Sequence, residues 1–355
     1  MEDALAAIRT HSLDYVEHVF GPGNGMAAVA GVLRGLFVAK PGHVLLSSDF
    51  TAIEGVVIAA LAGEQWRLEA FHEGRGLYVE SASRAFGIPI QEMLDYAKAN
   101  GSHHPMRQVG KGMELGLGFG GWIVALRQFD VEGTDDELKG YVLAWRAASK
   151  HIEWFWGGQK QGPADMLRGV AGASRWDKTP YHYGLEGAAI SAVLEPGTEH
   201  PVTRMDGSHT GISYLMLEDT LYCRLLSGRA IPYHRPRLVQ AQQEWRGLSL
   251  SFEGYNSNPK AGAIGWIRMN TYSGKLAENV VQATARDIQM NAIRQLEAAG
   301  YPIVMHTYDE VVAEVPEGFG SVEQLEAIMC NVPPWAAGWP IKAAGGWSAG
   351  RYRKG

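Results

Sequence analysis

Two acidic positions that lie far apart in the chain could together bind metal ions. Asp49 follows the apolar run VLLSS, and Asp309 and Glu310 lie in the middle of IVMHTYDEVVAEV. An acid at the end of an apolar strand is held rigidly near solvent, and Mg²⁺ prefers carboxylate oxygens together with water and phosphate oxygens. Two aspartates on adjacent strands would suit a pair of Mg²⁺ ions that activate an attacking oxygen and stabilise the leaving one. Taken alone, Asp309 and Glu310 are more simply explained as ordinary turn residues.

The stretch RQVGKGMELGLGFGG, residues 107–121, combines cations, apolar side chains and glycine. Arg107, Lys111, Leu115 and Phe119 are four residues apart, which predicts one shared flank of a helix. Two cations one turn apart suit a polyphosphate, because Arg offers a bidentate fork and Lys a point charge. Six of the fifteen residues are glycine, at about 1 kcal/mol each in a helix interior. We therefore expect another backbone or a nucleobase to approach closely here, although a small-residue packing face with solvated cations is an alternative.

A third feature is the basic stretch at residues 222–246, which holds five arginines and one acid in a chain of net charge −6. Arginines that neutralise phosphates are the source of non-specific affinity for DNA. Arg229, within this stretch, is a candidate DNA contact. A basic face that is merely solvated explains the stretch about as well.

Five strings in this order resemble the polymerase portion of the DNA polymerase I family (family A), most closely its phage and prophage branch. The resemblance covers the chain from about residue 4 to its end. The strings are LRGLFVAKPGH (33–43), DFTAIEG (49–55), RQVGKGMELGLGFGG (107–121), YSGKLAENVVQATARD (272–287) and YDEVVAEVP (308–316).

The resemblance implies a catalytic metal site. Asp49 and Asp309 match the two metal-binding aspartates, the backbone carbonyl of Phe50 would complete one metal shell, and Glu310 would support the site as a third catalytic acid. The implied cofactor is a pair of Mg²⁺ ions, for which Mn²⁺ can substitute.

The resemblance also implies a nucleotide site. Arg107 and Lys111 match the triphosphate-binding residues of the fingers helix, Leu115 the residue that faces the sugar, and Phe119 a tyrosine near the templating base. Glu54 matches the acid that occupies the space of a ribose 2′-OH, which predicts deoxynucleotides over ribonucleotides. Leu115 and Phe119 both depart from the family, which often has an aromatic residue at the first position and tyrosine at the second.

The implied primer contacts come from the last third of the chain. Gln282 matches a glutamine that contacts DNA near the primer terminus, and His306 and Tyr308 would flank the primer end. Tyr308 replaces the usual histidine before Asp-Glu, and Val56 replaces an arginine of many members. None of these departures removes a metal ligand or a triphosphate cation, so an active site is expected.

The elements that would position these residues indicate an α+β chain. The resemblance implies that it forms a right-hand palm built on an antiparallel sheet and helical fingers, with a thumb that is largely missing. The expected parts are a first palm segment with preceding helices (1–62), fingers (63–218) with a Trp-rich insertion at 145–183, and a second palm segment (219–355).

Local patterns give the expected elements along the chain. These are helices over roughly 2–20 and 25–38, a strand ending at Phe50, a buried helix stopping near Gly63, an aromatic helix at 141–156, a loop at 157–185, a helix ending before 196, short strands over 202–253, a long helix closed by Gly300, and a hairpin turning at residues 308–310.

Composition excludes several other classes of protein. The chain has 355 residues, 46% hydrophobic and 20% charged, and its two cysteines have no metal-ligand spacing. This favours a reducing, cytoplasmic setting, and the resemblance implies a bacterial cell or a phage-infected host. The N-terminus lacks the pattern of a signal peptide, and no apolar run is long enough to span a membrane.

The expected function is template-directed DNA synthesis on primer–template DNA with dNTPs, by two-metal-ion nucleotidyl transfer and without proofreading. Only 48 residues precede Asp49, so the alternative is a split polymerase or replisome subunit that needs a second polypeptide for the thumb and exonuclease. RNA synthesis on the same fold is a third alternative, against which Glu54 argues.

Overall fold

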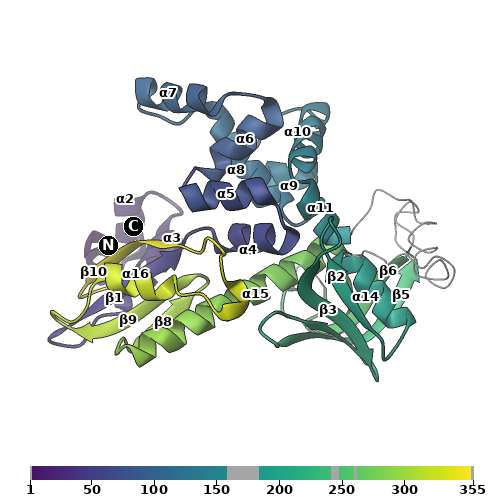
Figure 1. Cartoon of the computed structure of the whole chain (residues 1–355). Helices are drawn as coiled ribbons and strands as arrows, with labels where there is room; N and C mark the ends of the chain where they lie inside the picture. The colour runs from purple at the N-terminus through teal and green to yellow at the C-terminus, as the bar shows by residue number, and fades with distance from the viewer. Residues whose placement is uncertain (1, 158–183, 241–247, 260–261, 353–355) are drawn as a thin grey trace. The chain divides into compact units, whose positions relative to one another are not determined.

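The computed structural model describes residues 2–157, 184–240, 248–259 and 262–352 (Figure 1). The chain forms two compact units. The first comprises Met1–Ile53, Ile288–Pro334 and Ile341–Gly355, and the second comprises Glu54–Asp287 and Trp335–Pro340. The boundaries expected after residues 62 and 218 stay a prediction.

The first unit is built on a four-stranded antiparallel sheet with the strand order β10-β1-β9-β8. The strands are β1 (His43–Phe50), β8 (Ile303–Thr307), β9 (Glu310–Pro316) and β10 (Ala343–Ala349). The helix α16 (Val322–Met329) packs on β1 and β10. The predicted strand at Phe50 and the predicted hairpin at residues 308–310 are thus both present.

The N-terminal helices of this unit differ from the prediction. In place of one helix over 2–20, the chain forms α1 (Glu2–Ile8) and α2 (Leu13–Phe20), because His11 adopts a left-handed φ of 57°. The side chain of Ser12 then caps α2 by accepting a hydrogen bond from the Tyr15 N–H at 3.2 Å. The helix α3 (Gly25–Leu33) and a 3₁₀ turn (Arg34–Leu36) follow.

Helices make up most of the first half of the second unit. They are α4 (Ile53–Ala62), α5 (Gln65–Glu73), α6 (Leu77–Phe86), α7 (Ile90–Asn100), α8 (Pro105–Leu117), α9 (Ile123–Gln128), α10 (Asp135–Ala148), α11 (Lys150–Gly157) and α14 (Leu185–Leu194). The long α15 (Ser273–Ala298) begins in the second unit and ends in the first, since the second unit includes it only up to Asp287. The predicted aromatic helix at 141–156 is two helices, since the chain breaks at Ser149 between α10 and α11. Most of the predicted loop at 157–185 and of the Trp-rich insertion at 145–183 lies outside the described residues.

The second unit also contains a six-stranded antiparallel sheet whose strands follow one another in sequence order. They are β2 (Glu199–Thr203), β3 (His209–Leu217), β4 (Thr220–Arg224), β5 (Ala230–Gln240), β6 (Leu248–Asn256) and β7 (Gly265–Asn270). Side chains such as Tyr214, Leu221 and Tyr233 are buried, and α14 packs against β2 to β6 (Figure 1). Cys223 belongs to the same buried layer, and burial raises the pKa of its thiol to about 12.

Two antiparallel sheets together with many helices confirm the predicted α+β class. In the part of the chain that the structure describes, no helix has both the length and the apolar character that a membrane span requires.

Candidate active site

The first unit brings Asp49 and Asp309 to the same edge of its sheet. Asp49 lies one residue before the end of β1, and its Cα is paired in register with Glu310, the first residue of β9. The N–H of Phe50 donates to the carbonyl of Asp309 at 3.2 Å. Asp49, Phe50 and Asp309, the residues predicted to form the metal site, therefore lie together at this end of the sheet, although Asp309 is about 260 positions from the other two in sequence.

A two-residue turn between β8 and β9 presents Asp309. It consists of Tyr308 and Asp309, and Tyr308 has a left-handed φ of 53° with 92% of its side chain exposed. A non-glycine residue in this region is uncommon, and such strain often occurs at functional sites. Asp49 and Asp309 are both half-buried, which leaves carboxylates of this kind within reach of solvent and ligands.

Glu310 has a different environment from the two aspartates. Its side chain is buried, and its Oε1 accepts a hydrogen bond from the Ser47 hydroxyl at 2.7 Å. Its Oε2 accepts from the Tyr352 hydroxyl, and its backbone carbonyl accepts from the Gln289 amide at 3.1 Å. These contacts fix Glu310 at the start of β9, the strand that follows Asp309.

The chemistry of the donors fits a magnesium site of limited protein ligation. Among the residues that the structure describes, no group of three or more His, Cys, Asp or Glu side chains is placed to hold one ion. Two aspartates and a backbone carbonyl leave most positions of an octahedral shell to water and substrate, which is how Mg²⁺ is usually bound at phosphate-transfer sites.

In the second unit, α8 carries the predicted phosphate-binding cations. Arg107, Lys111 and Leu115 lie at successive turns of this helix. The guanidinium carbon of Arg107 lies 5.4 Å from the centroid of the Tyr78 ring of α6, a cation–π contact. Leu115 is 45% exposed.

The prediction that Phe119 shares this flank is wrong. The helix ends at Leu117, and Phe119 lies in the turn that follows. A Cβ added at Gly274, near the start of α15, would lie only 2.0 Å from the carbonyl oxygen of Phe119. The chain leaves the helix here because this turn packs directly on the backbone of α15.

The glycines of α8 allow the helix to pack against its own protein. A Cβ at Gly110 would lie 2.1 Å from the carbonyl oxygen of Tyr78, and a Cβ at Gly112 would lie 2.1 Å from a methyl group of Val131. Both glycines are buried. At these two positions the close approach expected from the sequence is therefore made by neighbouring segments of the chain.

A buried ion pair beneath α8 was not found by sequence reasoning. Both terminal nitrogens of Arg67, on α5, bind the carboxylate of Glu114, on α8, and the side chains are only 1% and 7% exposed. The Arg67 Nη2 also donates to the Ser149 hydroxyl at 2.8 Å, and the indole N–H of Trp145 donates to Glu114 at 2.8 Å. The sequence contained one sign of this pair, which was the single acid, Glu114, within a run of glycine and apolar residues.

A second buried acid lies beside this pair. Glu64 accepts a hydrogen bond from the His151 N–H at 3.0 Å at the start of α11. Burial raises the pKa of Glu64, although the charges of His151 and Arg67 oppose the shift. Glu114 of α8 is therefore held by polar contacts from α5 and α10, and Arg67 is bound in turn by Ser149 at the α10–α11 junction.

Three other residues that the resemblance implies for the site, Glu54, Gln282 and His306, lie on three different elements. Glu54 is half-buried in the first turn of α4. Gln282 is exposed on α15, and His306 is exposed on β8. Nothing in the geometry assigns these three a contact with nucleotide or DNA.

Arg229 has a structural explanation. Its Nε lies 2.8 Å from a carboxylate oxygen of Asp287, and its Nη2 donates to the carbonyl of Ala283 at 2.7 Å. These contacts attach the turn before β5 to α15. Arg229 thus has a role in the fold, which neither the DNA contact nor the solvated basic face expected from the sequence includes.

The sequence as a whole is similar to that of a phage DNA polymerase. It is 37% identical over 317 residues to the DNA polymerase of Bacillus phage SP02, a match that covers 88% of this chain and 42% of the relative. This chain is therefore similar to a DNA polymerase over most of its own length. No protein-family model matches the chain.

Two further matches are to polymerases as well. DNA polymerase I of Mycobacterium bovis is 29% identical over 146 residues, which cover 41% of this chain and 14% of the relative. The fold is similar to that of the POL domain of Pol1 from M. smegmatis, solved in complex with DNA primer-template and dNTP. That match has a TM-score of 0.50 and 21% identity, and covers 90% of this chain and 42% of the other. The chain thus spans less than half the length of these relatives.

Proposed function

We propose that the chain carries out template-directed DNA synthesis, adding deoxynucleotides to a primer 3′-OH. The observation that carries the proposal is the register of β1 against β9, which places Asp49 opposite Glu310 and next to Asp309. The similarity to the phage SP02 polymerase supports the same reaction.

In this proposal Asp49, Asp309 and the carbonyl of Phe50 hold two Mg²⁺ ions, with Mn²⁺ as a substitute. When bound, such ions supply charge neutralisation at the reacting phosphate and help an attacking hydroxyl and a leaving pyrophosphate. The protein contributes the fixed spacing of the aspartates, which the hydrogen bond from Phe50 to Asp309 maintains. Glu310 contributes by keeping the first residue of β9 in place.

Arg107 and Lys111 bind the triphosphate of the incoming nucleotide. A guanidinium held over the Tyr78 ring has less freedom to lose on binding, so Arg107 is prepared for a phosphate. In the same proposal, Leu115 faces the sugar, Glu54 excludes a 2′-OH, and Phe119 lies near the templating base.

The DNA partners of the proposal are a primer and its template. Gln282, His306 and Tyr308 contact the primer terminus. Arg229 also remains a candidate contact through its exposed edge, although its Asp287 partner limits the charge that it can offer to phosphate.

Primer extension tests the assignment. Asp49→Asn and Asp309→Asn should each lower kcat by at least roughly 100-fold, since groups that stabilise charge at a reacting centre are worth about 10²–10³. Asp136→Asn, at an exposed acid in the first turn of α10, is the matched control and should retain activity. An Asp309→Asn protein that extends primers at the normal rate would contradict the proposal.

A split enzyme is the alternative form of this function, because the chain spans 42% of the phage relative. It predicts extension only after a candidate partner polypeptide is added. Extension by the purified chain alone, with Mg²⁺, dNTPs and a primer–template, would exclude it.

A further inference from the structure

Two large aromatic side chains are exposed side by side on the six-stranded sheet. Tyr255 on β6 and Trp266 on β7 are paired in register, with ring centroids 6.4 Å apart. Their side chains are 60% and 65% exposed. The ring of His234, on β5, meets Trp266 edge-on at 5.8 Å, so aromatic rings from three adjacent strands lie together.

These rings lie on the face of the sheet opposite to its core. Side chains alternate between the two faces of a strand, and on β4 and β5 the alternate residues Leu221, Cys223 and Tyr233 are buried. Thr220, His234 and Glu253 are aligned across β4, β5 and β6 on the other face. Tyr255 and Trp266 stay largely exposed although their rings contact one another, and an exposed aromatic cluster of this kind indicates a binding surface.

The same strands carry a local excess of positive charge. The strands β4 to β7 contain four arginines and one acid, within a chain of net charge −6. The arginines are Arg224, Arg235, Arg237 and Arg268, and the acid is Glu253. The nearby acids Glu199 and Asp219 pair with Arg224 and Arg235, so the positive charge that remains to complement a polyanion is small.

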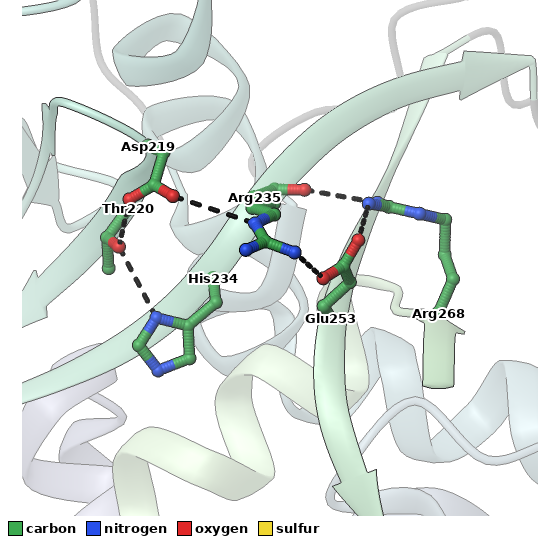
Figure 2. A network of polar contacts seen from close by, with 6 residues as sticks. All are labelled: Asp219, Thr220, His234, Arg235, Glu253 and Arg268. Atoms are coloured by element: carbon green, nitrogen blue, oxygen red, sulfur yellow. Dashed lines mark hydrogen bonds and ion pairs between the residues drawn. The ribbon is translucent and has the colours of Figure 1, made fainter. Parts of the chain in front are cut away.

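Two of the guanidinium groups, those of Arg235 and Arg268, are held in place by Glu253, as Figure 2 shows. The Glu253 carboxylate accepts from Arg235 at 2.8 Å and from Arg268 at 3.0 Å. Although the partial burial of Glu253 opposes it, the pKa of this carboxyl is lowered by the charges and hydrogen bonds of Arg235 and Arg268. The Arg268 Nη1 donates to the carbonyl of Arg235 at 3.1 Å.

The backbone at Arg235 is shaped to allow this arrangement. Arg235 has a left-handed φ of 45°, and the register of β5 against β6 shifts between His234 and Arg237. Its N–H donates to the carbonyl of Asp219 at 2.7 Å, which ties the bulge to the residue before β4. Bulges commonly re-aim side chains next to functional sites, and here the side chain of Arg235 remains 64% exposed.

We propose that this aromatic face, formed by His234, Tyr255 and Trp266 with Arg235 and Arg268, binds single-stranded nucleic acid. Bases stack on the rings of Tyr255 and Trp266, while the arginines lie along the phosphates. Aromatic platforms beside cations bind single strands with little sequence preference, because every base has a π face. Duplex DNA hides its base faces and would use only the arginines. This proposal rests on the proposed polymerase function. In that reaction, the single strand that the aromatic face binds is the unpaired part of the template.

Binding of a fluorescein-labelled oligo-dT of about 12 nucleotides, a length within the usual site sizes, tests the proposal by anisotropy. Trp266→Leu should weaken binding roughly 5- to 150-fold, the range for losing one stacked base, whereas Trp266→Phe keeps a ring and should recover most of it. Leu217→Ala is the control, because Leu217 is also exposed on this sheet and has no ring. Unchanged affinity in both Trp266→Leu and Tyr255→Ala would overturn the proposal.

Two further measurements separate this surface from the catalytic site and from other occupants. Asp309→Asn should bind oligo-dT normally, so a failure of the polymerase assignment would leave the binding result standing. Trp266→Leu should raise the KM for templates with long 5′ overhangs and leave that for one-nucleotide overhangs unchanged. If Trp266→Leu instead abolishes self-association in sedimentation without changing oligonucleotide affinity, the face is a contact between copies of the chain and the proposal is wrong.

Discussion

Glu310 in the four-stranded sheet and Glu114 in α8 are both buried carboxylates, and each lies next to a residue that we propose contacts the reacting groups. Their partners differ. Glu310 accepts hydrogen bonds from two neutral hydroxyls, those of Ser47 and Tyr352. Glu114 binds the guanidinium of Arg67 and the indole of Trp145.

The difference matters because of what remains when the carboxylate is removed. Hydroxyl groups can rotate to other partners, so the loss of a neutral hydrogen bond is modest. A buried guanidinium cannot lose its charge, and an unpaired buried charge is strongly unfavourable. We therefore expect α8 to tolerate changes beneath it far less well than the β1–β9 edge does.

The largest effect is expected for Glu114→Ala. It leaves Arg67 charged at a site where its side chain is 1% exposed, and breaking a buried pair typically costs about 3–5 kcal/mol. Urea unfolding followed by circular dichroism measures the loss. Glu92→Ala, at an exposed acid on α7, is the control and should change stability by less than about 0.5 kcal/mol.

The pair itself can be tested by removing both charges. A variant with Arg67→Leu and Glu114→Leu should lose less stability than the sum of the two single changes, because no unpaired charge remains. Strict additivity would show that the two side chains do not depend on one another. The comparison with Glu310 would then lose its basis.

The next effect concerns the packing of α8 on α6. Gly110→Ala places a Cβ 2.1 Å from the Tyr78 carbonyl oxygen, so the helices must separate, at about 1–3 kcal/mol. The same shift moves Arg107 relative to the Tyr78 ring and should raise the KM for dNTPs.

Gly140→Ala is the matched control for this change. A Cβ at Gly140, on α10, would meet no heavy atom within 4 Å, and alanine should stabilise the helix by roughly 0.5–1 kcal/mol. Opposite signs for the two variants in urea unfolding are the expected result. Equal effects would mean that the close contact at Gly110 does not hold in solution.

These residues show what the sequence could and could not predict. The strand ending at Phe50 and the hairpin around Asp309 follow from local patterns, which need only neighbouring residues. The register that pairs Asp49 with Glu310 depends on contacts between segments about 260 residues apart, and only the family resemblance suggested it. The end of α8 at Leu117 was missed because helical spacing continues to Phe119, while the turn is set by packing on Gly274.

Polar partners were the least predictable feature. Charge alone makes Arg229 a candidate DNA contact. In the structure its guanidinium pairs instead with Asp287, which is 58 positions away in sequence and could not be identified as its partner from local patterns. The ion pair between Arg67 and Glu114 likewise joins residues that are 47 positions apart in sequence. Composition reveals that a charge exists, but whether solvent, a ligand or another side chain neutralises it depends on tertiary structure.

The smallest effect on stability is expected for Glu310→Gln. Its effect on activity distinguishes a carboxylate that only anchors β9 from one that takes part in the reaction. The amide oxygen can still accept from one of the two hydroxyls, and the other hydroxyl can turn to accept from the amide, so the loss should be about 0.5–1.5 kcal/mol in urea unfolding. If Glu310 acts only by anchoring β9, Glu310→Gln should retain most primer extension, whereas Asp309→Asn loses it. Tyr352→Phe, which removes one donor and keeps the carboxylate, should then behave like Glu310→Gln. A Glu310→Gln protein as inactive as Asp309→Asn, beside an active Tyr352→Phe, would instead mean that the charge of Glu310 takes part in the reaction.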